Sequence, residues 1–375
     1  MTAPLGLLLV VLLSPFIGAL ADQRAWKREL LLASGAICAS LTVVLGLLQP
    51  GQVALAAGVY LIAAVACGLG ENGLGSFLPE ISTPKTVGRV SAIGWTTSYI
   101  GALLLLGITA AYTLGFGRDD PTQMRPMLLF AGLWFAVGMI PAVVWLRERA
   151  QPQSTPSTSL FASVCGRLVR SAKETKHFTQ LTRFFLAFAV YSAGTMTMIF
   201  GLGLIGDRLG FELNKLILMA AIIAVTAGLS AAIAGRYQDR VGHTRTICAY
   251  LGIWIVATLA MAAAEWIKVP EIVYWTVSGL IGVALGGIGT ASRAIVGAFT
   301  PESRAGEFFG LWGMIYKLAG VGGVVIFGWM SALLGQPIAL LVVAGMFAVG
   351  LMLLLRVDEV VGVEEAGIAA GDSHE

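Results

Sequence analysis

The chain alternates between long apolar runs and short segments rich in charge, glycine or proline. The hydrocarbon core of a bilayer is about 30 Å thick, so a helix needs about 20 apolar residues to cross it. Runs of about this length or longer cover residues 4–21, 29–48, 52–78, 88–114, 126–147, 180–206, 214–235, 244–264, 269–298, 305–333 and 336–356. The roughly ten-residue alternating segments of a membrane β-barrel are absent from the sequence. The pattern therefore predicts an all-α membrane protein with eleven transmembrane helices.

Composition indicates the same class of protein. Of the 375 residues, 57% are hydrophobic and only 12% are charged, which is too apolar for a soluble globular chain. The 47 glycines suit close helix packing in lipid, as in Gly282-x-x-x-Gly286 and Gly306-x-x-x-Gly310. The net charge of +3 comes from loop residues that set membrane topology. We therefore expect the lipid bilayer as the surroundings of the chain and no nucleic-acid partner.

Two short landmarks recur in the second half of the chain. The loop around Asp22 returns 217 residues later around Asp239, and Leu78-Pro79-Glu80 returns 222 residues later as Thr300-Pro301-Glu302. These offsets pair the first helix of the chain with the second helix of the later half. We therefore expect two repeats and a twelve-helix plan with eleven helices present. The counterpart of helix 180–206 would be missing, through truncation or a misplaced start codon.

The repeat divides the chain into four parts. Residues 1–147 should form a five-helix bundle, and residues 180–357 should form a six-helix bundle. In the linker, residues 148–179, apolar residues at helical spacing between 160 and 178 favour an amphipathic helix on the membrane surface, although a solvated basic loop fits equally well. The acidic tail, residues 358–375, should be disordered.

The apolar segment at the start of the chain has a second interpretation, a secretory signal peptide. Ala19-Leu20-Ala21 resembles a cleavage site after an apolar stretch. However, residues 1–4 lack the Lys or Arg of a signal peptide, and cleavage would leave Arg24 on the outer side, against the charge pattern of every later loop. We therefore favour a membrane helix.

The basic residues are strongly biased to one side of the membrane. The loops and tail on that side hold eighteen of them, whereas the opposite side holds five and Lys317 lies inside a helix. The eighteen are Arg24, Lys27, Arg28, Lys85, Arg89, Arg147, Arg149, Arg167, Arg170, Lys173, Lys176, Arg183, Arg236, Arg240, Arg245, Arg293, Arg304 and Arg356. Basic loops stay in the cytoplasm, so we expect the C-terminus inside, Met1 outside, and a multi-pass protein of the cytoplasmic membrane.

The two repeated loops carry a known pattern. Gly18-Ala-Leu-Ala-Asp22-Gln-Arg24 and Gly235-Arg-Tyr-Gln-Asp239-Arg240-Val-Gly242-His-Thr-Arg245 resemble the loop signature of the major facilitator superfamily, Gly-x-x-x-Asp-Arg-x-Gly-x-Arg. The first copy departs from it, with Trp26 and Lys27 where the second glycine is expected. The resemblance implies a two-bundle helical fold with a gating loop in each half. The gating residues would be Asp22, Arg24, Asp239, Arg240 and Arg245.

Further motifs resemble one branch of that superfamily. They are Leu78-Pro79-Glu80, Arg89-Val-Ser91-Ala-Ile-Gly94-Trp95, Ala291-Ser292-Arg293 and Glu307-Phe308-Phe309-Gly310. They are similar to the unknown-major-facilitator family and to the autophagy-related vacuolar amino-acid effluxers. Val321-Gly-Gly323 departs from this pattern, because a proline is expected there. The resemblance implies transport of a small polar solute, amino acids first, with efflux favoured over uptake.

The two loop aspartates have a specific expected position. We expect Asp22 near the N-terminus of helix 305–333 and Asp239 near the N-terminus of helix 88–114, because the positive end of a helix dipole attracts a carboxylate. There they would latch the two bundles together. The competing interpretation is an incidental aspartate in a turn at a helix C-terminus, because loop charges contribute little.

Three ionisable residues lie well inside the apolar runs. Such residues are costly in lipid and usually face a cavity or a partner. Glu71 and Arg293 each precede a landmark proline by eight residues, so the repeat places them at one depth, and Lys317 lies near the middle of its helix. We expect Glu71 to be the proton-coupling site, with Arg293 and Lys317 as its partners or as substrate ligands. For Arg293, simple snorkelling towards the cytoplasm is an equal alternative.

Other functional classes find little support in the sequence. It has no HExxH, GxSxG or Walker motif, and the four cysteines show no metal-ligand spacing, so we expect no enzyme activity, cofactor or metal. The sequence therefore predicts a monomeric secondary transporter that works by alternating access, with protons as a candidate coupling ion. The alternative is a transport-inactive membrane scaffold or sensor, which a missing helix would favour.

Overall fold

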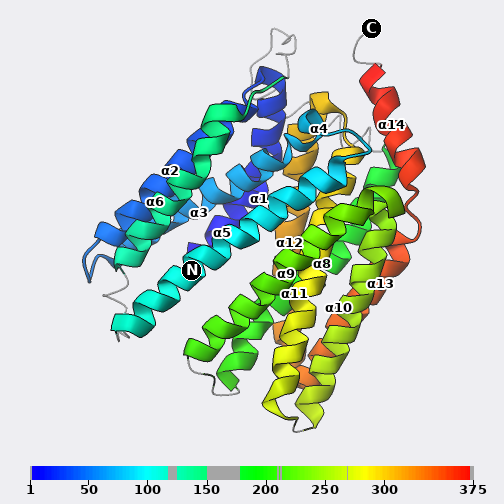
Figure 1. The fold of residues 1–375 in the computed structure, drawn as a ribbon. Helices are drawn as coiled ribbons and strands as arrows, with labels where there is room; N and C mark the ends of the chain where they lie inside the picture. The colour runs from blue at the N-terminus through cyan, green and yellow to red at the C-terminus, as the bar shows by residue number, and fades with distance from the viewer. Residues whose placement is uncertain are drawn as a thin grey trace. The chain divides into compact units, whose positions relative to one another are not determined.

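The computed structural model describes residues 2–116, 125–149, 178–208, 211, 213–267 and 269–371. Within these ranges, eleven helices are long and apolar enough to cross a membrane. This confirms the predicted number and type of the main elements. By contact, the chain divides into two compact units, each of which is described here by itself (Figure 1).

The first unit comprises Met1–Glu80, Gly107–Glu174 and Thr300–Met314. Its helices are α1 (Thr2–Arg24), α2 (Lys27–Leu47), α3 (Val53–Gly75), the short α4 (Leu78–Ile81) and α6 (Arg125–Trp145). Helix α3 packs between α1 and α2, and α2 also packs along α6. The first part of α12 (Ala305–Leu334) lies against α1 at very short range. A Cβ on Gly306 would lie 2.5 Å from the Gly18 carbonyl oxygen, so only glycine fits at this crossing.

The second unit comprises Ile81–Leu106, Thr175–Phe299 and Ile315–Glu375. It holds α8 (Thr179–Arg208), α9 (Leu213–Val241), α10 (His243–Trp266), α11 (Glu271–Ala298), α13 (Gln336–Leu354) and α14 (Glu359–Gly371), the first part of α5 (Val87–Phe116) and the second part of α12. Helices α9 and α11 approach closely, because a Cβ on Gly282 would lie 2.5 Å from the Ile223 carbonyl oxygen. The predicted small-residue packing is therefore present in both units.

The unit boundaries differ from the predicted bundles, residues 1–147 and 180–357. Residues 81–106, from the first repeat, pack in the second unit, and residues 300–314, from the second repeat, pack in the first. The reason lies at the starts of α5 and α12. The first turn of each helix donates hydrogen bonds to a carboxylate of the other repeat. A division of the chain by sequence order does not take these long-range bonds into account.

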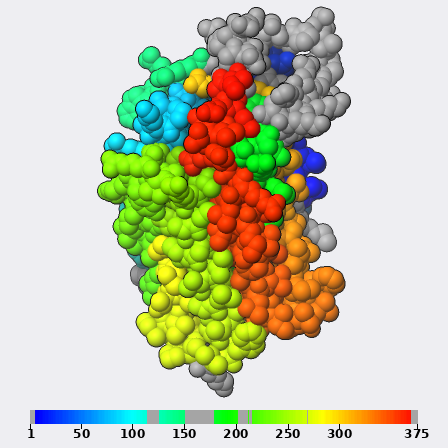
Figure 2. Space-filling model, turned by 90° about the vertical axis from the view of Figure 1, so that its right-hand side faces the viewer, coloured from blue at the N-terminus to red at the C-terminus, as the bar shows by residue number. Residues whose placement is uncertain are grey.

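The acidic tail is also a correction, because residues 359–371 form helix α14 rather than a disordered segment. Composition predicted disorder, but tertiary contacts order this helix. Gly362 lets α14 approach the ring of Phe299, and Glu365 accepts a hydrogen bond of 3.0 Å from the backbone N–H of Gln180. Figure 2 shows α14, in red, on the surface of the second unit. The amphipathic helix predicted between residues 160 and 178 lies almost wholly outside the described residues.

Candidate functional site

In the first unit, Asp22 lies at the end of α1 and caps the start of α12. Its two carboxylate oxygens accept hydrogen bonds of 2.9 and 2.8 Å from the backbone N–H groups of Gly306 and Glu307. These N–H groups in the first helical turn have no partner within the helix, and they lie at the positive end of its dipole. Asp22 is only 2% exposed, so both bonds form away from water. Its position is the one predicted from the loop pattern.

The side chain of Lys27 connects Asp22 to α4. Its Nζ lies 3.3 Å from Asp22 Oδ1 and 2.7 Å from Glu80 Oε1, and it donates to the Glu302 carbonyl oxygen at 3.2 Å. The Lys27 side chain is fully buried, so its charge is stabilised by these partners instead of by water. Sequence analysis did not select Lys27 as a site residue. The available signal was a lysine five residues after Asp22 in the repeated loop.

A second carboxylate, that of Glu148, caps the start of α2. It accepts hydrogen bonds of 3.1 and 3.0 Å from the backbone N–H groups of Lys27 and Arg28. Burial raises the pKa of the Glu148 carboxyl above its ordinary value, while these two backbone bonds act in the opposite direction. The Arg28 guanidinium donates to the carbonyl oxygens of Leu146 and Val143, at 2.8 Å each, which fastens α2 to the end of α6.

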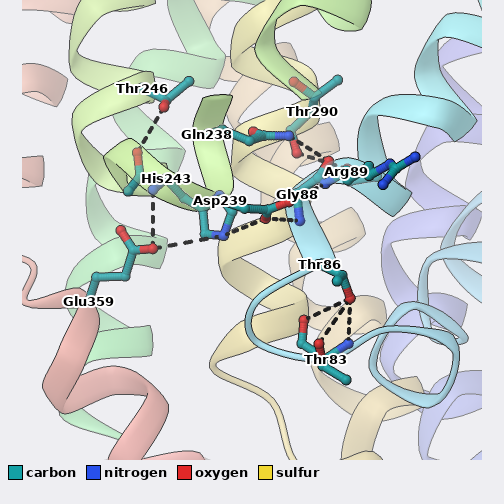
Figure 3. A network of polar contacts seen from close by, with 12 residues as sticks. Thr83, Thr86, Gly88, Arg89, Gln238, Asp239, His243, Thr246, Thr290 and Glu359 are labelled. Atoms are coloured by element: carbon teal, nitrogen blue, oxygen red, sulfur yellow. Dashed lines mark hydrogen bonds and ion pairs between the residues drawn. The ribbon is translucent and has the colours of Figure 1, made fainter. Parts of the chain in front are cut away.

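The second unit repeats this arrangement with other residues (Figure 3). Asp239, at the end of α9, accepts hydrogen bonds of 2.7 and 2.9 Å from the backbone N–H groups of Gly88 and Arg89 at the start of α5. The Gln238 side chain donates to the Gly88 carbonyl oxygen. A Cβ on Gly88 would lie 2.5 Å from Asp239 Oδ1, so a side chain here would push the carboxylate away from its donors. Asp239 therefore occupies the position predicted for it.

Glu359 matches Glu148 in this unit. From the start of α14, it accepts hydrogen bonds of 3.1 and 3.0 Å from the backbone N–H groups of His243 and Thr244, the first residues of α10. The buried imidazole of His243 lies between the two acids, with Nε2 3.7 Å from Asp239 and 3.8 Å from Glu359. Sequence analysis missed Glu359, because its acidic surroundings indicated disorder.

The predicted loop arginines do not share in these caps. Arg24, Arg240 and Arg245 are exposed, and the Arg24 guanidinium lies 5.5 Å from the centre of the Trp26 ring. Among the described residues of the first unit, the buried cation is Lys27 instead. Burial explains the difference, because a long, exposed side chain gains little from a nearby charge in water.

The three intramembrane charges are divided between the units. Glu71 is exposed on α3 in the first unit, whereas Arg293 on α11 and Lys317 on α12 belong to the second, where Lys317 is only 8% exposed. Their proposed coupling therefore stays a prediction. Next to Arg293, the Ser292 hydroxyl shares a buried hydrogen bond of 2.7 Å with Tyr191 of α8. Sequence analysis did not identify this polar pair.

Comparison with known proteins identifies the family. Residues 1–367 match the profile of the family described as "Vacuole effluxer Atg22 like". The chain belongs to this family. An uncharacterised major-facilitator-type transporter, YxiO of Bacillus subtilis, is 22% identical over 366 residues, which cover 96% of this chain and 84% of YxiO. Autophagy-related protein 22-1 of Neosartorya fischeri is 24% identical over 80% of this chain, which spans about half of that longer protein.

Solved structures show the same fold. The human organic anion transporter MFSD10 has a TM-score of 0.75 and 18% identity, covering 94% of this chain and 82% of its own. The proton:xylose symporter XylE has a TM-score of 0.71 and 13% identity, covering 94% and 84%. The predicted major-facilitator fold is therefore confirmed. The protein is a multi-pass member of a membrane-transport family and not an enzyme.

Proposed function

We propose that this protein is a secondary transporter that moves a small polar solute, amino acids first, by alternating access. The family description and the names of the fungal relatives favour efflux. The basic residues of the loops support a cytoplasmic membrane location with the C-terminus inside. On this proposal the working unit is a monomer, because each chain carries both repeats.

One observation carries the proposal, the exchange of caps between the repeats. Asp22 of the first repeat holds the start of α12 of the second, and Asp239 of the second repeat holds the start of α5 of the first. Each cap consists of two backbone N–H groups that donate to one carboxylate, and these bonds can break and re-form without a change in the helices. Two-state devices of this kind suit a transporter that alternates between conformations.

Proton coupling would reside at Glu71. On our proposal, Arg293 keeps Glu71 ionised in one conformation, and the next conformation releases Glu71 to take up a proton. Lys317, buried in its helix, would bind the carboxylate of a substrate or replace Arg293 as the partner of Glu71.

The test is flux in proteoliposomes. Purified protein, reconstituted with a panel of radiolabelled amino acids, should move at least one of them when a pH gradient is imposed. Empty liposomes and a variant with both caps removed, Asp22→Asn with Asp239→Asn, serve as controls. Correctly folded protein that moves no solute in either direction, with or without a gradient, would contradict the proposal. That outcome would favour a membrane scaffold or sensor.

A further inference from the structure

The second unit has a hollow between α8 and α13 that the transport proposal does not use. Four residues line it, Arg183 and Leu186 of α8 with Leu353 of α13 and Arg356 just beyond it, around a volume of about 390 Å³. Deeper along the same two helices the packing is tight. Gly350 of α13 meets Tyr191 of α8, where a Cβ would lie 2.8 Å from the tyrosine side chain. The hollow therefore opens only where α8 begins and α13 ends.

The four lining residues form two levels. Arg183 and Leu186 are three residues apart on α8, and Leu353 and Arg356 are three residues apart at the end of α13, so each pair lies on one face. The helices run in opposite directions, which places the two arginines together at the rim and the two leucines one turn deeper. A hydrogen bond of 3.3 Å from Arg183 Nη1 to the Arg356 carbonyl oxygen joins the Arg183 side chain to the backbone of Arg356.

The rim carries two positive charges. In the described part of the chain, no ion pair within 4 Å includes either arginine. Asp358 lies near the start of α8, because its backbone N–H donates to Gln180 Oε1 at 2.9 Å, but its carboxylate and that of Glu359 accept from other backbone groups. Asp358 accepts from the backbone N–H groups of Val360 and Val361, and Glu359 accepts from the first residues of α10. Two arginines at one rim, neither paired with a carboxylate among the described residues, suit an external anion.

The surroundings determine which anion fits. Leu186 is 58% exposed although it lies within a membrane-crossing helix, so the deeper level faces lipid chains. Arg183 and Arg356 both belong to the basic residues that the charge bias assigns to the cytoplasmic side. A basic rim at the cytoplasmic interface above an apolar level matches a phospholipid, with its phosphate outermost and its acyl chains below.

We propose that this hollow binds the phosphate group of an anionic membrane phospholipid. The planar guanidinium groups of Arg183 and Arg356 donate paired hydrogen bonds to the phosphate oxygens, a geometry that a single lysine does not supply. Leu186 and Leu353 contact the first carbons of the acyl chains. A bound lipid would neutralise the arginine pair and join the start of α8 to the end of α13. The proposal does not depend on the solute or on proton coupling.

The test measures lipid binding to the delipidated full chain in detergent by native mass spectrometry and by thermal unfolding. Phosphatidylglycerol should bind and raise the melting temperature, whereas zwitterionic phosphatidylcholine and inorganic phosphate should not. Arg183→Gln or Arg356→Gln should weaken phosphatidylglycerol binding about fivefold, and the double variant about 30-fold. Arg236→Gln is the matched control, because Arg236 is an exposed arginine that also donates to a carbonyl oxygen, that of Ala232 at 3.0 Å, away from the hollow.

Each alternative outcome overturns the proposal. Equal binding of phosphatidylcholine would show ordinary contact with lipid chains, and a thermal shift with inorganic phosphate alone would show a site for soluble anions. Unchanged phosphatidylglycerol binding in the double variant would mean that the arginines serve only topology. Arg356→Gln keeps the carbonyl group that accepts from Arg183, so this variant remains informative if Arg183→Gln unfolds.

Discussion

Lys27 shows how much one buried side chain can contribute to the stability of the first unit. Its ammonium group contacts two carboxylates, Asp22 and Glu80, in a region closed to water. Removing one member of such a group leaves the others charged and buried, which costs more than the pair itself contributes. The Glu80 side chain also accepts from the backbone N–H of Arg149 at 3.1 Å, so the effect extends to the segment after α6.

We expect Lys27→Met to lower the free energy of unfolding by about 3–5 kcal/mol, because Asp22 and Glu80 lose their buried cation. The measurement is a denaturant titration of the purified protein in detergent. Lys215→Met is the control. Lys215 pairs with Glu271 at 2.8 Å, but both side chains are more than 40% exposed and water replaces the lost partner. Equal losses in the two variants would show that burial does not set the effect.

In the part of the chain that the structure describes, four helices have their first turn capped by a carboxylate from a distant part of the sequence. Asp22 caps α12, Glu148 caps α2, Asp239 caps α5 and Glu359 caps α10. Each acid lies where unsatisfied N–H groups and the helix dipole both favour negative charge. The caps come in two matching sets, one in each unit, as a duplicated sequence requires. The helix starts are therefore fixed by tertiary contacts, because local capping residues do not supply these bonds.

Asp239→Asn tests the cap of α5. The amide keeps the shape of the side chain but lacks the charge and offers one acceptor oxygen in place of two, so Gly88 or Arg89 loses its partner. We expect the variant to favour the conformation that is open to the cytoplasm, with faster labelling of single cysteines introduced on the cytoplasmic side. Glu364→Gln, an exposed acid of α14, is the control. Labelling rates equal to those of the parent protein would contradict a latch.

At the scale of the whole molecule, the transport proposal requires charges in both units to act together. Glu71 lies in the first unit, whereas Arg293 and Lys317 lie in the second. Energetic coupling between these charges would therefore require a conformational change that involves both units. The sequence repeat predicts equivalent depths for Glu71 and Arg293. On our proposal, this acid and this base pair in one conformation and separate in another.

We expect Glu71→Gln to abolish flux driven by a pH gradient and to leave exchange of solute across the membrane, because only the proton site is lost. Glu71→Arg combined with Arg293→Glu should recover more stability than either single change, since the double swap restores a pair of opposite charges. Proteoliposome flux and denaturant titration measure the two effects. A double variant no more stable than the single ones, together with intact pH-driven flux in Glu71→Gln, would place the proton site elsewhere.

The sequence by itself determined the elements and their duplication. Apolar runs of about 20 residues can only be helices in lipid, because every backbone polar group must be satisfied within the segment. The recurrence of Asp22 as Asp239 also predicted where both carboxylates lie, since the same loop pattern is present in each half. These features are local or periodic, and a linear pattern contains them.

Only the tertiary structure decided the partners that are far apart in the chain. Lys27 and Glu80 are separated by 53 residues and His243 and Glu359 by 116, and nothing in their local sequences pairs them. Composition alone predicted disorder for the tail around Glu359. In the structure, the backbone N–H groups at the start of α10 donate to the Glu359 carboxylate and hold it in place. The physical reason is the same in each case. A buried charge is stable only where hydrogen-bond donors or opposite charges surround it, and these groups come together only when the chain folds.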